Sequence, residues 1–226
     1  MKRIETWLTW LLGPVVLIDL YLSLIWSPKE KTMGDLIRIM YFHVGSVWAS
    51  YVAFTVTLVA SVLYLILRNV LYDQIAGCSA EIGVLYTTIT LITGSIWAKP
   101  MWNTWWTWDP RLTTTLLLWF LYVFYLLLRG FFVNQRRRAL VAGIFSIIAF
   151  ADIPVIHFAV EWWNSIHPQV IDETGIFMPG SMFFTLSFSF FAFSVLYMVL
   201  LLTRFQQVRM KSDLKSLQRQ IDSIEV

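Results

Sequence analysis

The chain has three histidines, His43, His157 and His167, and each lies beside or between long apolar segments. Neutral imidazole is a good metal ligand and the common axial ligand of haem iron. Two histidines from different segments, one on each side of a flat ring, would complete a six-coordinate iron site. We expect His43 and His167 to be that pair, because both flank the tryptophan-rich segment from Trp97 to Arg111. An interfacial hydrogen-bonding role is the alternative for all three.

Five tryptophans lie among the fifteen residues from Trp97 to Arg111, which read WAKPMWNTWWTWDPR. Tryptophan collects at membrane interfaces, but such a belt accounts for only one or two residues at each helix end. Indole rings bury large areas and stack on other π-systems, so the segment predicts a platform for a flat aromatic ligand. A bare ion such as zinc is the alternative, but it would not need aromatic neighbours. The tryptophans that we expect at the ligand are Trp102, Trp105, Trp106 and Trp108.

Charged residues in the same segment match the polar edge of a porphyrin, which carries two carboxylates. We expect Lys99 and Arg111 to pair with them, because arginine can bind a carboxylate through two parallel hydrogen bonds. Asp109 precedes Pro110, and an Asp–Pro pair is typical of a helix start, with Asp as the N-cap and Pro as the first helical residue. Asp109 is therefore expected at the site, as a ligand contact or as the cap of the next helix.

The elements that must position these residues are membrane-spanning helices. Hydrophobic residues make up 58% of the 226 residues and charged residues only 14%, whereas soluble domains have about 25% charged residues. A spanning helix needs roughly 17–25 apolar residues, and its backbone must be hydrogen-bonded within the segment. The sequence thus predicts an all-α integral membrane protein with a bundle of six transmembrane helices. The expected spans are about 7–26, 46–67, 80–98, 113–129, 139–158 and 181–203.

Lysine and arginine are unevenly divided between the two sides of this bundle. Twelve of the seventeen lie on the side of the termini, which by the positive-inside rule predicts that both termini are cytoplasmic. The outward-facing loops are then 27–45, 98–112 and 159–180, and all three histidines lie on that side. Residues 1–6 are short and basic, but no small-residue cleavage site follows the first apolar run, so we expect the first span to be retained. Cys78 is the single cysteine, which excludes an intrachain disulfide.

Some polar features have no assigned chemistry. Asp19 and Asp152 lie within expected spans, where ionisable groups are costly and often functional, and Pro154 is expected to bend the fifth helix. Residues 1–203 are expected to form the membrane domain and residues 204–226 a cytosolic tail helix. That tail is either a frayed amphipathic helix or a docking helix, because its apolar residues alternate at spacings of four and three. They are Met210, Leu214, Leu217, Ile221 and Ile224.

The run WAKPMWNTWWTWDPRLT resembles the "WWD" signature of a haem-handling protein family that acts in cytochrome c biogenesis. Within that family, the FHV sequence around His43 and the run IPVIHFAVEWWNSIH that ends at His167 are similar to the CcmC branch, haem exporter protein C. The CcmF and CcsA branches are longer and have an additional histidine pattern. The resemblance covers about residues 10–203. The family usually has glycine where Ala98 and Asn103 stand.

The resemblance implies a haem delivery protein rather than an enzyme, in the bacterial inner membrane with its functional loops on the periplasmic side. His43 and His167 would be the axial ligands of haem b, and loop 97–113 would bind the macrocycle and dock the haem chaperone CcmE. CcmD and the ATP-binding-cassette subunits CcmA and CcmB would be further partners, with membrane lipid and no nucleic acid. The sequence has no glycine-rich phosphate loop, which agrees with ATP being handled by another subunit.

Two other functions remain open at this point. The chain could be a transmembrane haem transporter, an exporter subunit of an ABC-type complex. Such proteins usually have polar mid-membrane residues and internal repeats, and the sequence has few of the former and no clear repeat. A redox enzyme, such as a quinone oxidoreductase, would bury haem between histidines within the spans, whereas only His157 borders a span.

Overall fold

The computed structural model describes residues 2–163, 165–167, 171–172, 175–176 and 178–222, and these are mostly helical. The helices are α1 (Lys2–Tyr21), which continues into the π-helical turn η1 (Leu22–Trp26), α2 (Ile37–Leu67), α3 (Val70–Trp102), α4 (Pro110–Phe131), α5 (Gln135–Phe150), α6 (Asp152–Trp162) and α7 (Gly180–Asp222). Two short strands, β1 (Ile171–Asp172) and β2 (Gly175–Ile176), pair antiparallel between α6 and α7, with Ile171 opposite Ile176.

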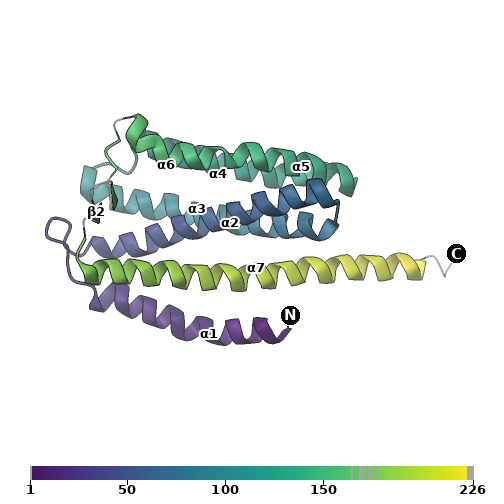
Figure 1. The fold of residues 1–226 in the computed structure, drawn as a ribbon, viewed down its shortest axis with the longest axis horizontal. Coiled ribbons are helices and arrows are strands. Elements are labelled where there is room, and N and C mark those ends of the chain that lie inside the picture. Colours follow the sequence, from purple (N-terminus) through teal and green to yellow (C-terminus); the bar gives the residue numbers. More distant parts are fainter. Residues whose placement is uncertain (1, 164, 168–170, 173–174, 177, 223–226) are drawn as a thin grey trace.

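Six helical segments of the described chain are long and apolar enough to cross a membrane, which confirms the predicted fold class. They are Thr6–Trp26, Ile37–Leu67, Val70–Trp102, Pro110–Phe131, Gln135–Trp162 and Gly180–Asp222. Both termini lie at one end of the bundle, and the η1–α2 and α3–α4 connections lie at the other (Figure 1).

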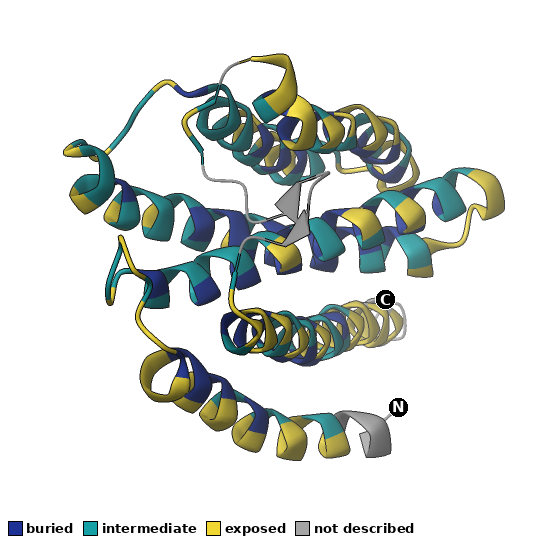
Figure 2. Ribbon diagram, turned by 60° about the vertical axis from the view of Figure 1, so that its left-hand side comes forward, coloured by how far each residue is buried: buried dark blue, intermediate teal, exposed yellow. Residues whose placement is uncertain are grey.

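Helices α2 and α3 lie in the middle of the bundle (Figures 1 and 2). Helices α4, α5 and α6 lie on one side of this pair, whereas α7 packs on the other side and α1 packs on α7. Small residues let the central pair approach closely, as is usual for helices in membranes. Ala53 and Ala80 are fully buried, and a Cβ added at Gly83 would clash with the ring of Phe54.

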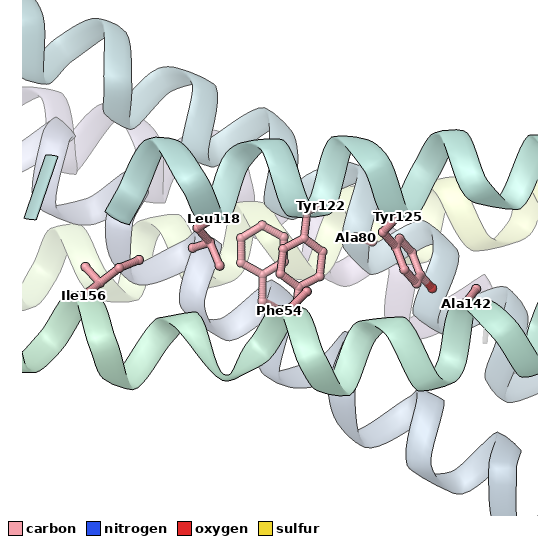
Figure 3. Packing of buried hydrophobic residues seen from close by; sticks show 8 residues of the cluster. Phe54, Ala80, Leu118, Tyr122, Tyr125, Ala142 and Ile156 are labelled. Atoms are coloured by element: carbon pink, nitrogen blue, oxygen red, sulfur yellow. The ribbon is translucent and has the colours of Figure 1, made fainter. Parts of the chain in front are cut away.

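The main hydrophobic cluster lies between the central layer and the α4–α6 layer. The rings of Phe54 and Tyr122 stack with centroids 3.6 Å apart and an interplanar angle of 17°, and Figure 3 shows them face to face. Leu118 of α4 and Ile156 of α6 continue the cluster towards the end of the bundle that carries the candidate site (Figure 3).

The predicted loop boundaries were wrong at two places that matter for function. Residues 27–45 were expected to be a loop, but α2 begins at Ile37, so His43 lies within a helix. No proline interrupts residues 37–45, and Gly45 is buried against Phe193, so the apolar pattern continues as helix. Likewise α3 extends to Trp102, so only residues 103–109 of the tryptophan segment are non-helical.

The fifth span is interrupted, as expected from Pro154. Helix α5 ends at Phe150 and α6 begins at Asp152. Proline lacks an N–H and its ring clashes with the carbonyl four residues earlier, which here belongs to Phe150.

The sixth span, by contrast, continues through Arg204 without a break as α7, and the apolar tail residues from Met210 to Ile221 are exposed. Ile224 lies outside the described residues.

Candidate functional site

A cavity of about 1080 Å³ lies at the end of the bundle opposite the termini. Small-molecule sites usually measure about 300–1,000 Å³, so this cavity has room for a large ligand. Its walls come from α2, α3, α4, α6, α7 and loop 27–36, and Leu118 and Ile156 connect it to the hydrophobic cluster. Five of the predicted site residues line it, namely His43, Trp102, Trp106, Arg111 and His167. Trp97 and His157 line it as well.

The imidazole of His43 is held from α3. Its Nδ1 lies 3.0 Å from the hydroxyl of Thr93, and that hydroxyl donates its own hydrogen to the carbonyl of Ile89 at 2.7 Å. This arrangement favours the tautomer with its proton on Nδ1, in which the hydroxyl accepts from His43 and the lone pair of Nε2 is available to a ligand. Gly94 makes room for the ring, because a Cβ at this position would lie 3.1 Å from Cε1 of His43.

His167 lies in the connection between α6 and α7. Its Nδ1 is buried and has no hydrogen-bond partner among the described residues, and its ring lies 6.5 Å from the Trp102 ring, centroid to centroid. Burial lowers the pKa of His167 to about 3, and the nearby Arg111 and His43 act in the same direction. The ring is therefore neutral at physiological pH, which is the form that binds metals.

Asp109 connects α4 to the segment that carries His167. Its side chain caps α4 by accepting from the N–H of Arg111 at 2.9 Å, which confirms the predicted N-cap. It also accepts from the hydroxyl of Ser165, at 2.8 Å, and from the N–H of Ile166, at 2.9 Å. Ser165 in turn accepts from the N–H of His167 at 3.1 Å. Asp109 is buried and does not line the cavity, so its contacts position the histidine segment.

The tryptophans divide into an inner and an outer group. Trp97 and Trp102 meet edge to face with centroids 5.2 Å apart, and both line the cavity with Trp106. The indole nitrogens of Trp97 and Trp106 are buried without a hydrogen-bond acceptor among the described residues. Trp105 and Trp108 do not line the cavity, and their exposed fractions are 59% and 77%. The inner group can contact a ligand, whereas the outer group faces the surroundings.

The two predicted cations lie in different places. Arg111 lines the cavity and forms no ion pair with the described residues. The Lys99 ammonium instead donates to the carbonyl of Asn103 at 3.2 Å, and Lys99 does not line the cavity. Asn103 ends α3 in the left-handed conformation, with φ of 55°. Glycine is the usual residue for this conformation and asparagine is the common substitute, which explains the departure from the family pattern.

Several residues of the site were not predicted from the sequence. Thr93 and Gly94 lie within an apolar helix and Ser165 in an ordinary loop, so their types carry no signal without the fold. The two membrane carboxylates lie away from the cavity lining. Asp19 accepts a hydrogen bond from Ser189 of α7 at 2.7 Å, and Asp152 is buried at the start of α6.

The fold and the cavity define a polytopic α-helical membrane protein with a large cavity at one end of its bundle. The family model "CcmC: Heme exporter protein C" matches residues 1–220. The chain belongs to the CcmC family, which confirms the resemblance seen in the sequence.

Relatives in bacteria and plants support this assignment. The chain is 37% identical over 185 residues to a "Putative cytochrome c biosynthesis ccmC-like mitochondrial protein" of Marchantia polymorpha, covering 80% of this chain and 78% of the relative. It is 35% identical over 209 residues to "Heme exporter protein C" of Haemophilus influenzae, covering 89% and 84%. It is 32% identical over 218 residues to the protein of the same name of Bradyrhizobium diazoefficiens, covering 96% and 82%.

Proposed function

We propose that this protein binds haem b in the cavity, with the iron between His43 and His167. The observation that carries the proposal is that these two histidines, on separate segments, line one cavity together with Trp102 and Trp106. The Thr93 contact at Nδ1 leaves His43 Nε2 free for the iron. Metal-binding histidines commonly form such a hydrogen bond through the ring nitrogen that does not bind the metal. His167 is neutral and is positioned through Asp109.

The rest of the haem would contact the inner tryptophans and one cation. Trp97, Trp102 and Trp106 supply apolar area for the macrocycle, and the unpaired indole N–H groups of Trp97 and Trp106 are potential donors to a propionate. Arg111 would bind a propionate.

Other residues of the segment would not touch the haem. The contacts of Asp109 support an indirect role for it, and those of Lys99 do not support a haem contact. Trp105 and Trp108 are exposed beside the cavity and are the residues we assign to docking of the haem chaperone CcmE.

In this proposal the protein handles haem for cytochrome c maturation, a role that the names of its relatives support. It presents haem at the periplasmic face of the bacterial inner membrane and delivers it to CcmE. The lysine and arginine count supports cytoplasmic termini and a cytosolic tail after Arg204. CcmD and the ABC subunits CcmA and CcmB are the proposed partners, and the protein acts in delivery and assembly without catalysing a reaction itself.

Transport of haem across the bilayer is the alternative that the name "Heme exporter protein C" suggests for the relatives. The packing favours delivery at one face. Below the cavity, Leu118 and Ile156 join the stacked Phe54 and Tyr122 in a packed hydrophobic cluster, and burying the two haem carboxylates there without charged partners would be costly.

Absorption spectroscopy of the purified protein tests the proposal. Wild type from haem-replete cells should contain about one six-coordinate haem per chain. His43→Ala and His167→Ala should each lower the haem content or convert the residual haem to a five-coordinate form, and added imidazole should reverse the conversion. His167→Met should give a shifted spectrum, because methionine is an alternative axial ligand. A wild type without a Soret band, or alanine variants with wild-type spectra, would contradict the proposal.

A further inference from the structure

Loop 27–36, between η1 and α2, lines the cavity through three consecutive charged residues, Lys29, Glu30 and Lys31. The carboxylate of Glu30 is occupied within the loop. It accepts from the N–H and the hydroxyl of Thr32 and from the N–H of Met33, each at 2.6 Å. These hydrogen bonds lower the pKa of Glu30 to about 2, so the Glu30 carboxylate is charged at physiological pH and continues to accept them.

Lys29 is also occupied within the loop. Its ammonium lies 2.6 Å from the carboxylate of Asp35, which binds Arg38 at 2.9 Å as well. The hydrogen bond from Lys29, helped by Arg38, lowers the pKa of Asp35. Lys29 therefore already has an anionic partner.

Lys31 differs from its neighbours. Lys31 is exposed and lines the cavity. Its ammonium forms no ion pair with the described residues. The turn that carries it is closed by two backbone hydrogen bonds between Glu30 and Gly34, at 2.9 and 3.3 Å. Gly34 has φ of 58°, a conformation that glycine adopts without strain. The loop thus holds an unpaired cation at the cavity.

We propose that Lys31 binds a carboxylate of the ligand, as the second cation of the cavity beside Arg111. This inference rests on the proposed function, because haem carries two carboxylates and the sequence had assigned the second one to Lys99. Arg111 and Lys31 are the cavity-lining cations without an acidic partner among the described residues. Glu161 of α6 also lines the cavity, and its charge disfavours carboxylates on that wall.

Equilibrium titration of the haem-free protein with haem and with haem dimethyl ester tests this role. The ester has the same macrocycle and iron but no charged carboxylate. Lys31→Met should weaken haem binding about three- to five-fold, the effect of losing one solvent-accessible ion pair. Binding of the dimethyl ester should be the same in Lys31→Met and wild type. Lys99→Met is the matched control and should bind both compounds like wild type.

The outcomes separate this inference from the proposed function. A wild type that binds neither compound would overturn both. A wild type that binds haem, with a Lys31→Met variant of equal haem affinity, would overturn only the role of Lys31. Equal weakening for haem and the ester would also overturn it, because the effect would not pass through a carboxylate. Lys31→Glu gives a second check, since charge reversal should weaken haem binding more than Lys31→Met does and leave the ester unaffected.

Discussion

The carboxylate of Asp109 accepts a hydrogen bond from the backbone N–H of Ile166 at 2.9 Å. The same side chain caps α4, so the first turn of that helix and the residue before His167 are held by one buried group. Asp109 can therefore be essential for an iron site without touching the iron or the haem.

Replacing Asp109 by alanine should release the His167 segment. We expect Asp109→Ala to increase the fraction of five-coordinate haem, with six-coordination restored by added imidazole. Ser165→Ala should have a smaller effect, because the bond from the Ile166 N–H remains. Loss of an N-cap also costs about 1 kcal/mol of stability. Asn134→Ala controls for this, because Asn134 caps α5 at the other end of the bundle and should leave the haem spectrum unchanged. Unchanged coordination in Asp109→Ala would contradict the positioning role.

The space at Gly94 should limit haem binding through His43. A Cβ there lies 3.1 Å from the His43 ring, so Gly94→Ala must displace the imidazole by a few tenths of an ångström, and Gly94→Val by more. Haem content should fall in that order. Gly130→Ala is the control, because a Cβ at Gly130 meets no atom within 4 Å. Equal haem content in Gly94→Val and wild type would show that the ring does not need its present position.

The hydroxyl of Thr93 should strengthen the iron bond of His43 by holding Nδ1–H. Thr93→Val keeps the shape and removes the acceptor, so haem affinity should fall about ten-fold, as for other groups that orient a metal-binding histidine. Thr55→Val is the control, because among the described residues the Thr55 hydroxyl bonds only to the carbonyl of Tyr51. A titration showing the same haem affinity for Thr93→Val and wild type would remove this hydrogen bond from the account.

An ion cluster at the end of the bundle near the termini should contribute to stability and not to haem binding. Asp73 is buried and binds Arg129 at 2.6 Å and Arg138 at 2.9 Å. Asp73→Ala leaves two arginines without their anion, which should cost about 3 kcal/mol and lower the melting temperature in detergent. Asp35→Ala, at an exposed ion pair, should change it little. A wild-type melting temperature in Asp73→Ala would show that the cluster is not stabilising.

The six spans and the cap at Asp109 could be predicted because both depend on local sequence. Apolar length determines a span, and an Asp–Pro pair determines a helix start. The starts and ends of the helices were less predictable. Residues 37–45 and 97–102 contain polar side chains, but hydrogen bonds within the helix, and burial of Gly45 against Phe193, extend α2 and α3.

Contacts between distant segments could not be predicted. The bonds of Asp109 with Ser165 join residues 56 positions apart, and the contact of His43 with Thr93 spans 50. The sequence favoured Lys99 as a carboxylate partner because it lies in the tryptophan segment, and it gave no reason to choose Lys31. The hydrogen bond of Lys99 to Asn103 and the closed turn at Glu30 appear only in the fold.

A structure of the haem-loaded protein tests the central claim most directly. We predict one haem in the cavity, with the iron bonded to Nε2 of His43 and to His167. Iron bonded to His157 or to a non-histidine ligand, or haem bound outside the cavity, would contradict it.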